Sequence, residues 1–154
     1  MTSEILEGLN EQQHAAVTAD DGPVLVLAGP GSGKTSVLTR RIAYLIEARH
    51  VKPWHIMAVT FTNKAASEMR ARIYDLLGQP VRVQLGTFHA TCARILRIEH
   101  GYTDYNKDFV IYDTDDQLSA IEQAMSELNI DKKKFSSRGI LGAISSAKNE
   151  MILP

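Results

Sequence analysis

The chain has 154 residues, of which 44% are hydrophobic and 23% charged, and its formal net charge is −1. These totals suit one folded domain, or one domain together with part of a second, and they exclude a disordered chain. Neither a membrane-spanning run nor a secretory signal is predicted from the sequence. A single cysteine, Cys92, cannot form an internal disulfide and fits a reducing compartment, so the expected location is cytoplasmic.

Charge is distributed unevenly along the chain. Residues 1–33 carry five acidic residues and no Lys or Arg, residues 34–100 carry eleven basic against four acidic residues, and residues 101–154 carry six against nine. A basic middle region can form a face that binds a polyanion. Charge alone favours the other interpretation, in which the same side chains lie scattered on solvated helix surfaces.

Short β-type runs alternate with longer helical runs, which predicts an α/β fold with a parallel sheet flanked by helices. Asn10 is the expected N-cap of a first short helix. In chain order, the expected elements are a strand over Val24–Ala28, a helix from Lys34 to about Ala48, a strand over Ile56–Phe61, a helix from Asn63 to Leu77, a strand over Val81–Leu85, a helix from about His89 to His100, and a strand over Phe109–Tyr112. Asn63 is the expected cap of the second long helix, and Gly78 is expected to end it.

The character of the chain changes at Asp113. From there on, two amphipathic helical runs follow without a strand between or after them. We therefore expect residues 1–112 to be the first part of one domain, and residues 113–154 to be the beginning of a helical subdomain. On this interpretation, we expect the sequence to be the N-terminal part of a longer protein.

A phosphate-binding loop is predicted where the first expected strand meets the first long helix. Glycines let successive backbone N–H groups point inward, and the following helix N-terminus adds a partial positive charge. In this pattern Lys34 reaches the β- and γ-phosphates, and the Thr35 hydroxyl coordinates Mg²⁺. The residues of the loop are Ala28, Gly29, Pro30, Gly31, Ser32, Gly33, Lys34 and Thr35, with Ala28 at a position that the strict pattern gives to glycine. The sequence predicts binding of ATP or GTP with Mg²⁺.

Hydrolysis requires a carboxylate near Mg²⁺ and a group that orients water. No Asp-Glu pair directly follows an apolar strand in the expected elements, although such a pair could place a carboxylate near Mg²⁺. Asp113, Asp115 and Asp116 come after the last expected strand, but their position is typical of acids at a helix start. We therefore expect little ATP turnover from this chain by itself.

Four ordered stretches together resemble the N-terminal part of the superfamily 1 DNA helicases of the UvrD/PcrA/Rep type. They are "LNEQQHAAV" (residues 9–17), "AGPGSGKT" (28–35), "TFTNKAASEM" (60–69) and "GTFHATCARIL" (86–96). "ILGAISSAKNE" (140–150) is similar to the inserted helical subdomain of that family. The resemblance implies a RecA-like P-loop NTPase fold with the start of an inserted all-helical subdomain.

The resemblance also implies roles in ATP binding and catalysis. Gln13 matches the glutamine that reads the adenine edge in the family, which implies ATP in preference to GTP because an amide can pair with both N6–H and N7. Lys34 and Thr35 are the expected catalytic residues. The family often has a basic residue directly after that threonine, where this chain has Ser36. Arg40 and Arg41 are the residues that could contribute a nucleotide contact instead, with Arg41 the expected one and a solvated helix face favoured for Arg40.

Two of the stretches resemble motifs that hold single-stranded DNA. A flat aromatic face and short hydrogen-bonding side chains at a helix start suit bases and phosphates. Without the resemblance, an ordinary strand-to-helix turn with Phe61 in the core and Asn63 as cap is about equally favoured. The expected DNA-binding residues are Thr60, Phe61, Thr62, Asn63, Thr87, Phe88 and His89.

The function implied by the family is that of an ATP-dependent helicase or translocase that moves 3′ to 5′ on DNA. Its expected partners are single-stranded DNA, DNA junctions and a second RecA-like domain of the same parent chain, with no membrane partner, in DNA repair or DNA replication. The isolated chain is expected to lack efficient ATPase and unwinding activity. The alternative from a different class is a stand-alone P-loop nucleotide switch or small kinase that does not bind DNA.

Overall fold

The computed structural model describes residues 2–153, which divide into two compact units. The first unit extends to Lys107 and the second begins at Asp108. The sequence predicted a boundary after residue 112, so the structural division falls slightly earlier in the chain. Each unit is described separately below.

The first unit contains most of the regular structure. Its elements are α1 (Thr2–Leu6), α2 (Glu11–Thr18), α3 (Lys34–Glu47), the 3₁₀ turn η1 (Pro53–His55), β1 (Met57–Thr60), α4 (Asn63–Leu77), β2 (Gln84–Thr87), α5 (Phe88–Ile98) and the 3₁₀ turn η2 (His100–Tyr102). The helices expected after Asn10, from Lys34 and from Asn63 are all present as α2, α3 and α4. Helix α1 was not predicted, because five residues are too few to show a helical period.

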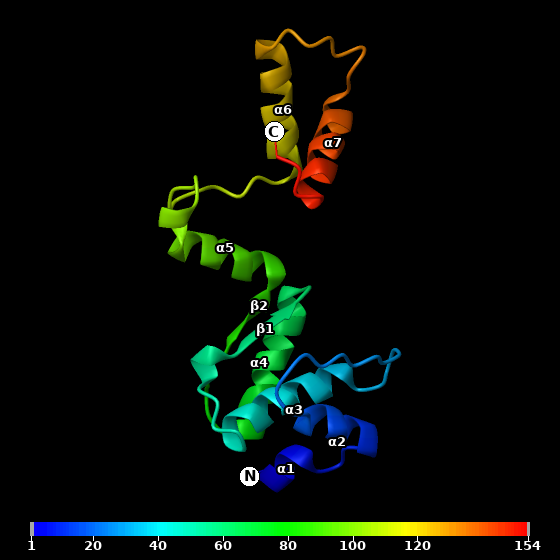
Figure 1. Ribbon diagram of the computed structural model, residues 1–154, viewed down its shortest axis with the longest axis vertical. Coiled ribbons are helices and arrows are strands. Elements are labelled where there is room, and N and C mark those ends of the chain that lie inside the picture. Colours follow the sequence, from blue (N-terminus) through cyan, green and yellow to red (C-terminus); the bar gives the residue numbers. More distant parts are fainter. Residues whose placement is uncertain (1, 154) are drawn as a thin grey trace. The chain divides into compact units, whose positions relative to one another are not determined.

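Strands β1 and β2 form a parallel two-stranded sheet, with α4 between them in the chain (Figure 1). The register places Met57 opposite Gln84 and Thr60 opposite Thr87. Because the strands are parallel, their carboxyl ends lie at the same edge. The residues that follow Thr60 and Thr87 are therefore brought together, although they are far apart in sequence.

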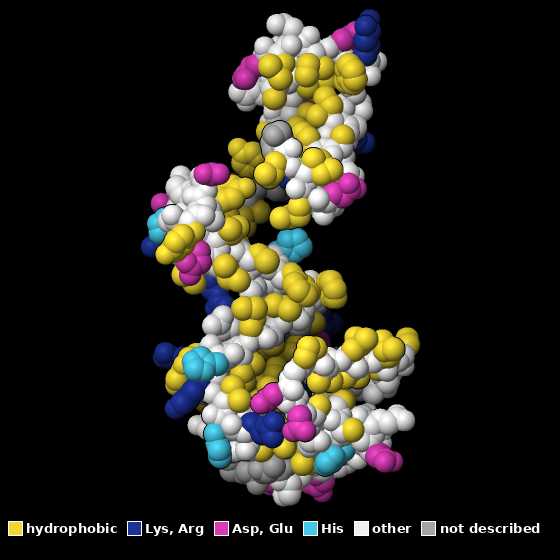
Figure 2. Space-filling view, in the orientation of Figure 1, with side chains coloured by type: hydrophobic (Ala, Val, Ile, Leu, Met, Phe, Trp, Pro, Cys, Tyr) yellow, Lys and Arg dark blue, Asp and Glu magenta, His cyan; other side chains and the backbone are white. Residues whose placement is uncertain are grey.

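Two of the predicted strands are absent from the described residues. Residues 24–28 and 109–112 have no strand assignment, and their side chains are largely exposed: Leu25 is 82% and Val110 75% accessible. Figure 2 shows hydrophobic side chains on the surface of the segment between α2 and α3. The physical reason is strand pairing, since a strand exists only where a neighbouring strand receives its backbone hydrogen bonds, and the sheet among the described residues consists of β1 and β2.

The third predicted strand and one predicted cap are displaced. Strand β2 begins at Gln84 and includes Thr87, whereas the prediction covered residues 81–85. Thr62, and not Asn63, is the N-cap of α4, because its hydroxyl accepts a hydrogen bond from Ala65 N at 3.1 Å. The predicted end of α4 is confirmed: Gly78 follows it with φ 66°, in the left-handed region that glycine tolerates best.

The core of the first unit lies between α3, α4 and β1. Its buried residues are Ile5, Ile42, Ala43, Ile56, Ala58, Met69, Ile73 and Leu77, with Val81 and Val83 packed against them. The Arg40 guanidinium donates hydrogen bonds to the carbonyls of Glu4 and Ile5, so it ties α1 to α3. Arg40 is thus a structural residue on this face of α3.

Two methionines of the first unit provide a test of this core. Met69→Ala is expected to lower the free energy of unfolding by about 2–5 kcal/mol, because Met69 is only 2% exposed and its removal leaves a cavity. Met57→Ala is the matched control. Because Met57 is 54% exposed, its replacement should lower the free energy of unfolding by less than about 0.5 kcal/mol. Urea unfolding followed by far-UV circular dichroism measures both. Equal losses in the two variants would contradict the assigned core.

The second unit is a helical hairpin of α6 (Thr114–Glu127) and α7 (Ser137–Asn149). Asp113 is the N-cap of α6, and it forms a capping box with Asp116 as expected for acids at a helix start. The Ser137 hydroxyl at the start of α7 donates to Glu122 of α6 at 3.1 Å. Met125 is the one buried hydrophobic residue among the described residues of this unit, so its core is small.

Candidate functional site

The predicted phosphate loop is a tight turn that leads directly into α3. Gly31 and Gly33 have φ values of 76° and 79°, which side chains rarely tolerate, and Gly33 is the N-cap of α3. A Cβ atom at Gly33 would also lie only 3.0 Å from the Gln13 Nε2 atom. Glycine is therefore favoured at position 33 by its backbone angle, and a side chain there would also have to displace the Gln13 amide.

Lys34 folds back over the loop that precedes it. Its Nζ donates to the carbonyls of Ala28 at 3.1 Å and Gly29 at 2.6 Å. The Ser32 hydroxyl also donates to the Gly29 carbonyl, at 2.7 Å. The ammonium group is exposed at the mouth of the loop, so phosphate oxygens could replace these neutral carbonyls with stronger, charged acceptors.

Gln13 brings α2 into contact with the loop. Its side-chain Nε2 donates to the Ser32 carbonyl at 3.1 Å, and Asn10 caps the same helix turn. Among the described residues, the neighbouring Gln12 has no hydrogen bond to the loop, although its side chain also lines the cleft beside the loop. Geometry thus distinguishes the two glutamines, which sequence alone leaves adjacent and similar.

These residues border an open cleft of about 890 Å³. Its lining includes most of the predicted nucleotide-binding residues: Gln13, Ala28, Gly29, Gly31, Ser32, Gly33, Lys34 and Arg41. Pro30 and Thr35 are exposed and lie outside that lining. A second groove of about 430 Å³, between α4 and the segment before β2, contains none of the predicted site residues.

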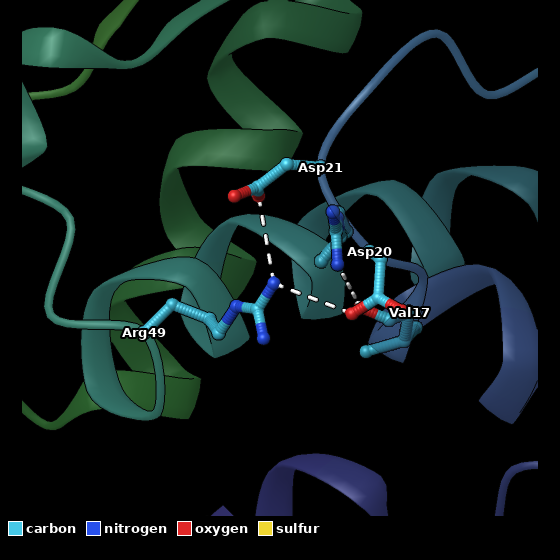
Figure 3. Close-up of polar contacts among 5 residues, drawn as sticks. Val17, Asp20, Asp21 and Arg49 are labelled. Carbon is cyan, nitrogen blue, oxygen red and sulfur yellow. Dashed lines mark hydrogen bonds and ion pairs between the residues drawn. The ribbon is translucent and has the colours of Figure 1, made fainter.

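Two arginines, Arg41 of α3 and Arg49 just after it, contact the last turn of α2 and the residues that follow it. The Arg41 guanidinium donates to the Val17 carbonyl at 2.8 Å, at the last turn of α2. Figure 3 shows Arg49 between Asp20 and Asp21, with a nitrogen 3.5 Å from a carboxylate oxygen of each. Arg41 therefore has a structural contact in addition to its place in the cleft wall.

The two predicted DNA motifs lie side by side at the carboxyl ends of β1 and β2. Phe61 follows β1 and Phe88 follows β2, and their ring centroids are 5.5 Å apart with a 47° angle between the ring planes. Phe61 is 90% exposed and Phe88 46%. The interpretation that Phe61 is a core residue is therefore wrong, because its ring presents an aromatic face to solvent.

The polar residues of the two motifs have different roles. Thr62 and Thr87 are the N-caps of α4 and α5, and the Thr87 hydroxyl accepts from Ala90 N at 3.2 Å while its side chain is buried. The Thr60 hydroxyl donates to the Thr62 carbonyl at 3.0 Å. Asn63 and His89 are exposed. Two helix N-termini, each with unpaired N–H groups and partial positive charge, therefore open at this edge beside the aromatic pair.

The described residues provide few ligands for a metal ion. They contain no group of three His, Cys, Asp or Glu residues that could hold one. The exposed Thr35 hydroxyl, in the first turn of α3, is the predicted Mg²⁺ ligand, and nucleotide phosphates and water would supply the remaining oxygens.

Sequence reasoning overlooked Asn10 as a member of the site. It was predicted only as a helix cap, yet its backbone N–H donates to Gln13 Oε1 at 3.1 Å, next to the loop. The signal was present as an Asn followed three residues later by a Gln, the pattern of a capping box.

Comparison with known proteins decides the family of this chain. The family model of the UvrD/REP helicase N-terminal domain matches residues 9–154. The chain belongs to this family. Its relatives include the ATP-dependent DNA helicase PcrA of Bacillus subtilis, 52% identical over the whole chain, PcrA of Staphylococcus epidermidis, 46% identical over 97% of the chain, and the ATP-dependent DNA helicase UvrD1 of Mycobacterium tuberculosis, 48% identical over 98%.

The matched region is a small part of these relatives. The UvrD/REP-type chain covers 21% of the length of each of the two PcrA proteins and 20% of UvrD1. Between residues 2 and 153, no helix is both long enough and apolar enough to span a membrane.

Proposed function

We propose that this chain is the ATP-binding and single-stranded-DNA-binding portion of an ATP-dependent DNA helicase or translocase that moves 3′ to 5′. The observation that carries the proposal is the shared edge of β1 and β2, where an exposed pair of aromatic rings lies beside two helix N-termini. Rings suit bases, and helix N-termini suit phosphates. The family membership and the names of the relatives support the same assignment.

ATP is the proposed nucleotide, with Mg²⁺ as its metal. The loop from Ala28 to Thr35 offers backbone N–H groups, the Lys34 ammonium and the start of α3 to the phosphates. Thr35 would coordinate Mg²⁺, which would neutralise charge between the β- and γ-phosphates. The relatives are named as ATP-dependent enzymes, which supports ATP.

In this proposal the fold is RecA-like, residues 1–112 are the first part of the ATP-binding domain, and residues 113–154 begin an inserted helical subdomain. The further partners are DNA junctions and a second RecA-like domain of the same parent chain. We place the protein in the cytoplasm, since its single cysteine fits a reducing compartment.

The isolated 154-residue chain is expected to bind ATP with little turnover and no unwinding. The reason is that the described residues bring no carboxylate cluster to the loop, and no second nucleotide-binding half is present among them. Steady-state phosphate release, measured with and without single-stranded oligonucleotide, tests this expectation. Strong DNA-stimulated release from the isolated chain would contradict it.

The alternative, a stand-alone P-loop switch or small kinase, makes a different prediction about DNA. It requires nucleotide binding without affinity for an oligonucleotide. Helicase-type binding should instead weaken steeply with salt, because phosphate contacts release counterions. A chain that binds ATP but shows no oligonucleotide binding at low salt would favour the alternative.

A further inference from the structure

Hydrogen bonds link the turn η1 to the start of β2 and to α5. The Gln84 Nε2 atom donates to the Trp54 carbonyl at 3.1 Å, and the Gln84 Oε1 atom accepts from a guanidinium nitrogen of Arg94 at 2.5 Å. Gln84 is the first residue of β2, whereas Phe88 follows its last residue. This network therefore lies at the amino ends of the strands, opposite the edge where Phe61 and Phe88 lie.

The side chains of this network lie on one face of the sheet. On the other face, Val83 and Leu85 line the groove beside α4. Because side chains alternate along an extended chain, Arg82 and Gln84 point away from that groove, to the side where α5 supplies Arg94. Helix α4 thus covers one face of this segment, and basic side chains gather on the other.

Trp54 presents a large aromatic surface beside these basic side chains. It is 54% exposed and lies outside the core of the first unit. The Lys52 ammonium lies 5.6 Å from the centroid of the Trp54 ring, and the His55 ring meets that ring nearly edge-on, at 81° between the planes. An exposed indole among cations offers a flat face on which a nucleic-acid base can stack.

The segments that carry this face contain no acidic residue. Residues 48–67 and 76–98 together have six Lys or Arg and no Asp or Glu. Lys52, Arg82 and Arg94 take part in none of the ion pairs of the described residues. Figure 2 shows Lys, Arg and His side chains gathered over η1. The surface, called the η1 patch below, consists of Lys52, Trp54, Arg82 and Arg94. Its charge complements a polyanion.

The η1 patch is close to the strand edge proposed for single-stranded DNA. Phe88 and Arg94 lie six positions apart on α5, which corresponds to about 9 Å along a helix axis. Strand β2 spans a further route of about 10–13 Å between the patch and that edge. A single strand bound at the strand edge would need only a few more nucleotides to reach Trp54.

We propose that the η1 patch is a second contact for single-stranded nucleic acid, which continues the path from the strand edge. Its three cations bind phosphates, and the Trp54 ring stacks on a base. An acidic peptide would satisfy the same cations, but the exposed indole among them favours a ligand with flat bases. This inference rests on the proposed function, because it extends the DNA path that begins at β1 and β2.

The aromatic part is tested with thymidine oligonucleotides of two lengths, about 4 and about 14 nucleotides, of which the shorter can occupy only the strand edge. In fluorescence anisotropy, Trp54→Ala should weaken binding of the longer one by about fivefold or more and change the shorter one by less than about twofold. The Gln84 contact survives this change, because it uses the Trp54 backbone carbonyl. Tyr74→Ala is the matched control, since Tyr74 is 51% exposed and lines the groove on the α4 side.

A second variant tests the charge. Arg82→Gln should lower the slope of log affinity against log salt for the longer oligonucleotide by about 0.7, the value expected for one phosphate contact of a single strand. Arg72→Gln removes the same charge from an exposed position of α4 and should leave that slope unchanged. Circular dichroism verifies that all variants are folded.

Unchanged affinity and salt slope in folded Trp54→Ala and Arg82→Gln would overturn the inference and leave the strand-edge site intact. Equal losses for the two oligonucleotides would also overturn it, because the shorter one does not reach the patch. A glutamate peptide that bound as tightly as the longer oligonucleotide, and lost its binding in Arg82→Gln, would assign the patch to acidic peptides instead. If the unmodified chain bound neither oligonucleotide, the proposed function would fail and the inference would fail with it.

Discussion

Replacement of Lys34 by alanine is expected to weaken ATP binding by about 100-fold or more, because hydrogen bonds to charged groups contribute about 1.5–3 kcal/mol each and this ammonium can make several to the phosphates. The fold should be unaffected. Lys34 is exposed, and its ammonium donates hydrogen bonds to the exposed loop carbonyls of Ala28 and Gly29, so its removal should change the free energy of unfolding by less than about 0.5 kcal/mol.

Lys52→Ala is the control for charge. Lys52 lies outside the cleft, 5.6 Å from the centroid of the Trp54 ring, so this change removes one positive charge from the same unit without touching the loop. Isothermal titration calorimetry with ATP and Mg²⁺ compares the variants. If Lys34→Ala retained wild-type affinity, the loop would not be the nucleotide site.

The second large effect is expected at Phe61. Stacking of a base on an aromatic ring contributes about 1–3 kcal/mol, so Phe61→Ala should weaken single-stranded DNA binding by about 5- to 150-fold. Because the ring is 90% exposed, little stability should be lost. In a chain that already carries Phe61→Ala, the further change Phe88→Ala should weaken DNA binding by a smaller factor than it does in the unmodified chain, because the two rings are in contact.

Tyr102→Ala is the matched control for the aromatic ring. Tyr102 belongs to the same unit and is 89% exposed, but it lies in η2, away from the strand ends. Fluorescence anisotropy of a labelled thymidine oligonucleotide measures the affinities at fixed salt. A change of less than twofold in Phe61→Ala, or an equal change in Tyr102→Ala, would count against the proposed DNA contact.

The helices of the first unit could be predicted from sequence because their signals are local. Asn10 begins a capping box, Gly78 supplies a left-handed residue, and apolar side chains such as Ile42 recur with the period of a helix. The phosphate loop was predictable for the same reason, since its glycines and Lys34 are consecutive in the chain.

The strands were less predictable because pairing is not a local property. Val24–Ala28 has the composition of a buried strand, yet nothing within that run specifies its neighbour, and the described residues provide none. Strand β2 extends to Thr87 because Thr60 lies opposite it in the register. The contact between Phe61 and Phe88 follows from that register and could not be derived from either motif alone.

Which residue caps a helix depends on which side chain lies close enough to accept a hydrogen bond from a free backbone N–H of the first turn. Thr62 displaces Asn63 as the cap of α4 because its hydroxyl lies 3.1 Å from Ala65 N. Likewise, the link between Gln13 and Ser32 joins segments separated by 19 positions in the chain, and no spacing rule predicts such a contact.

The central claim is that one chain holds two separate sites, a loop for ATP and a strand edge for single-stranded DNA. The most direct measurement titrates each ligand into the unmodified chain, Lys34→Ala and Phe61→Ala. We predict that the unmodified chain binds both ligands, that Lys34→Ala loses ATP and keeps DNA, and that Phe61→Ala loses DNA and keeps ATP. Failure of the unmodified chain to bind the oligonucleotide, or loss of both ligands in folded Phe61→Ala, would contradict the account.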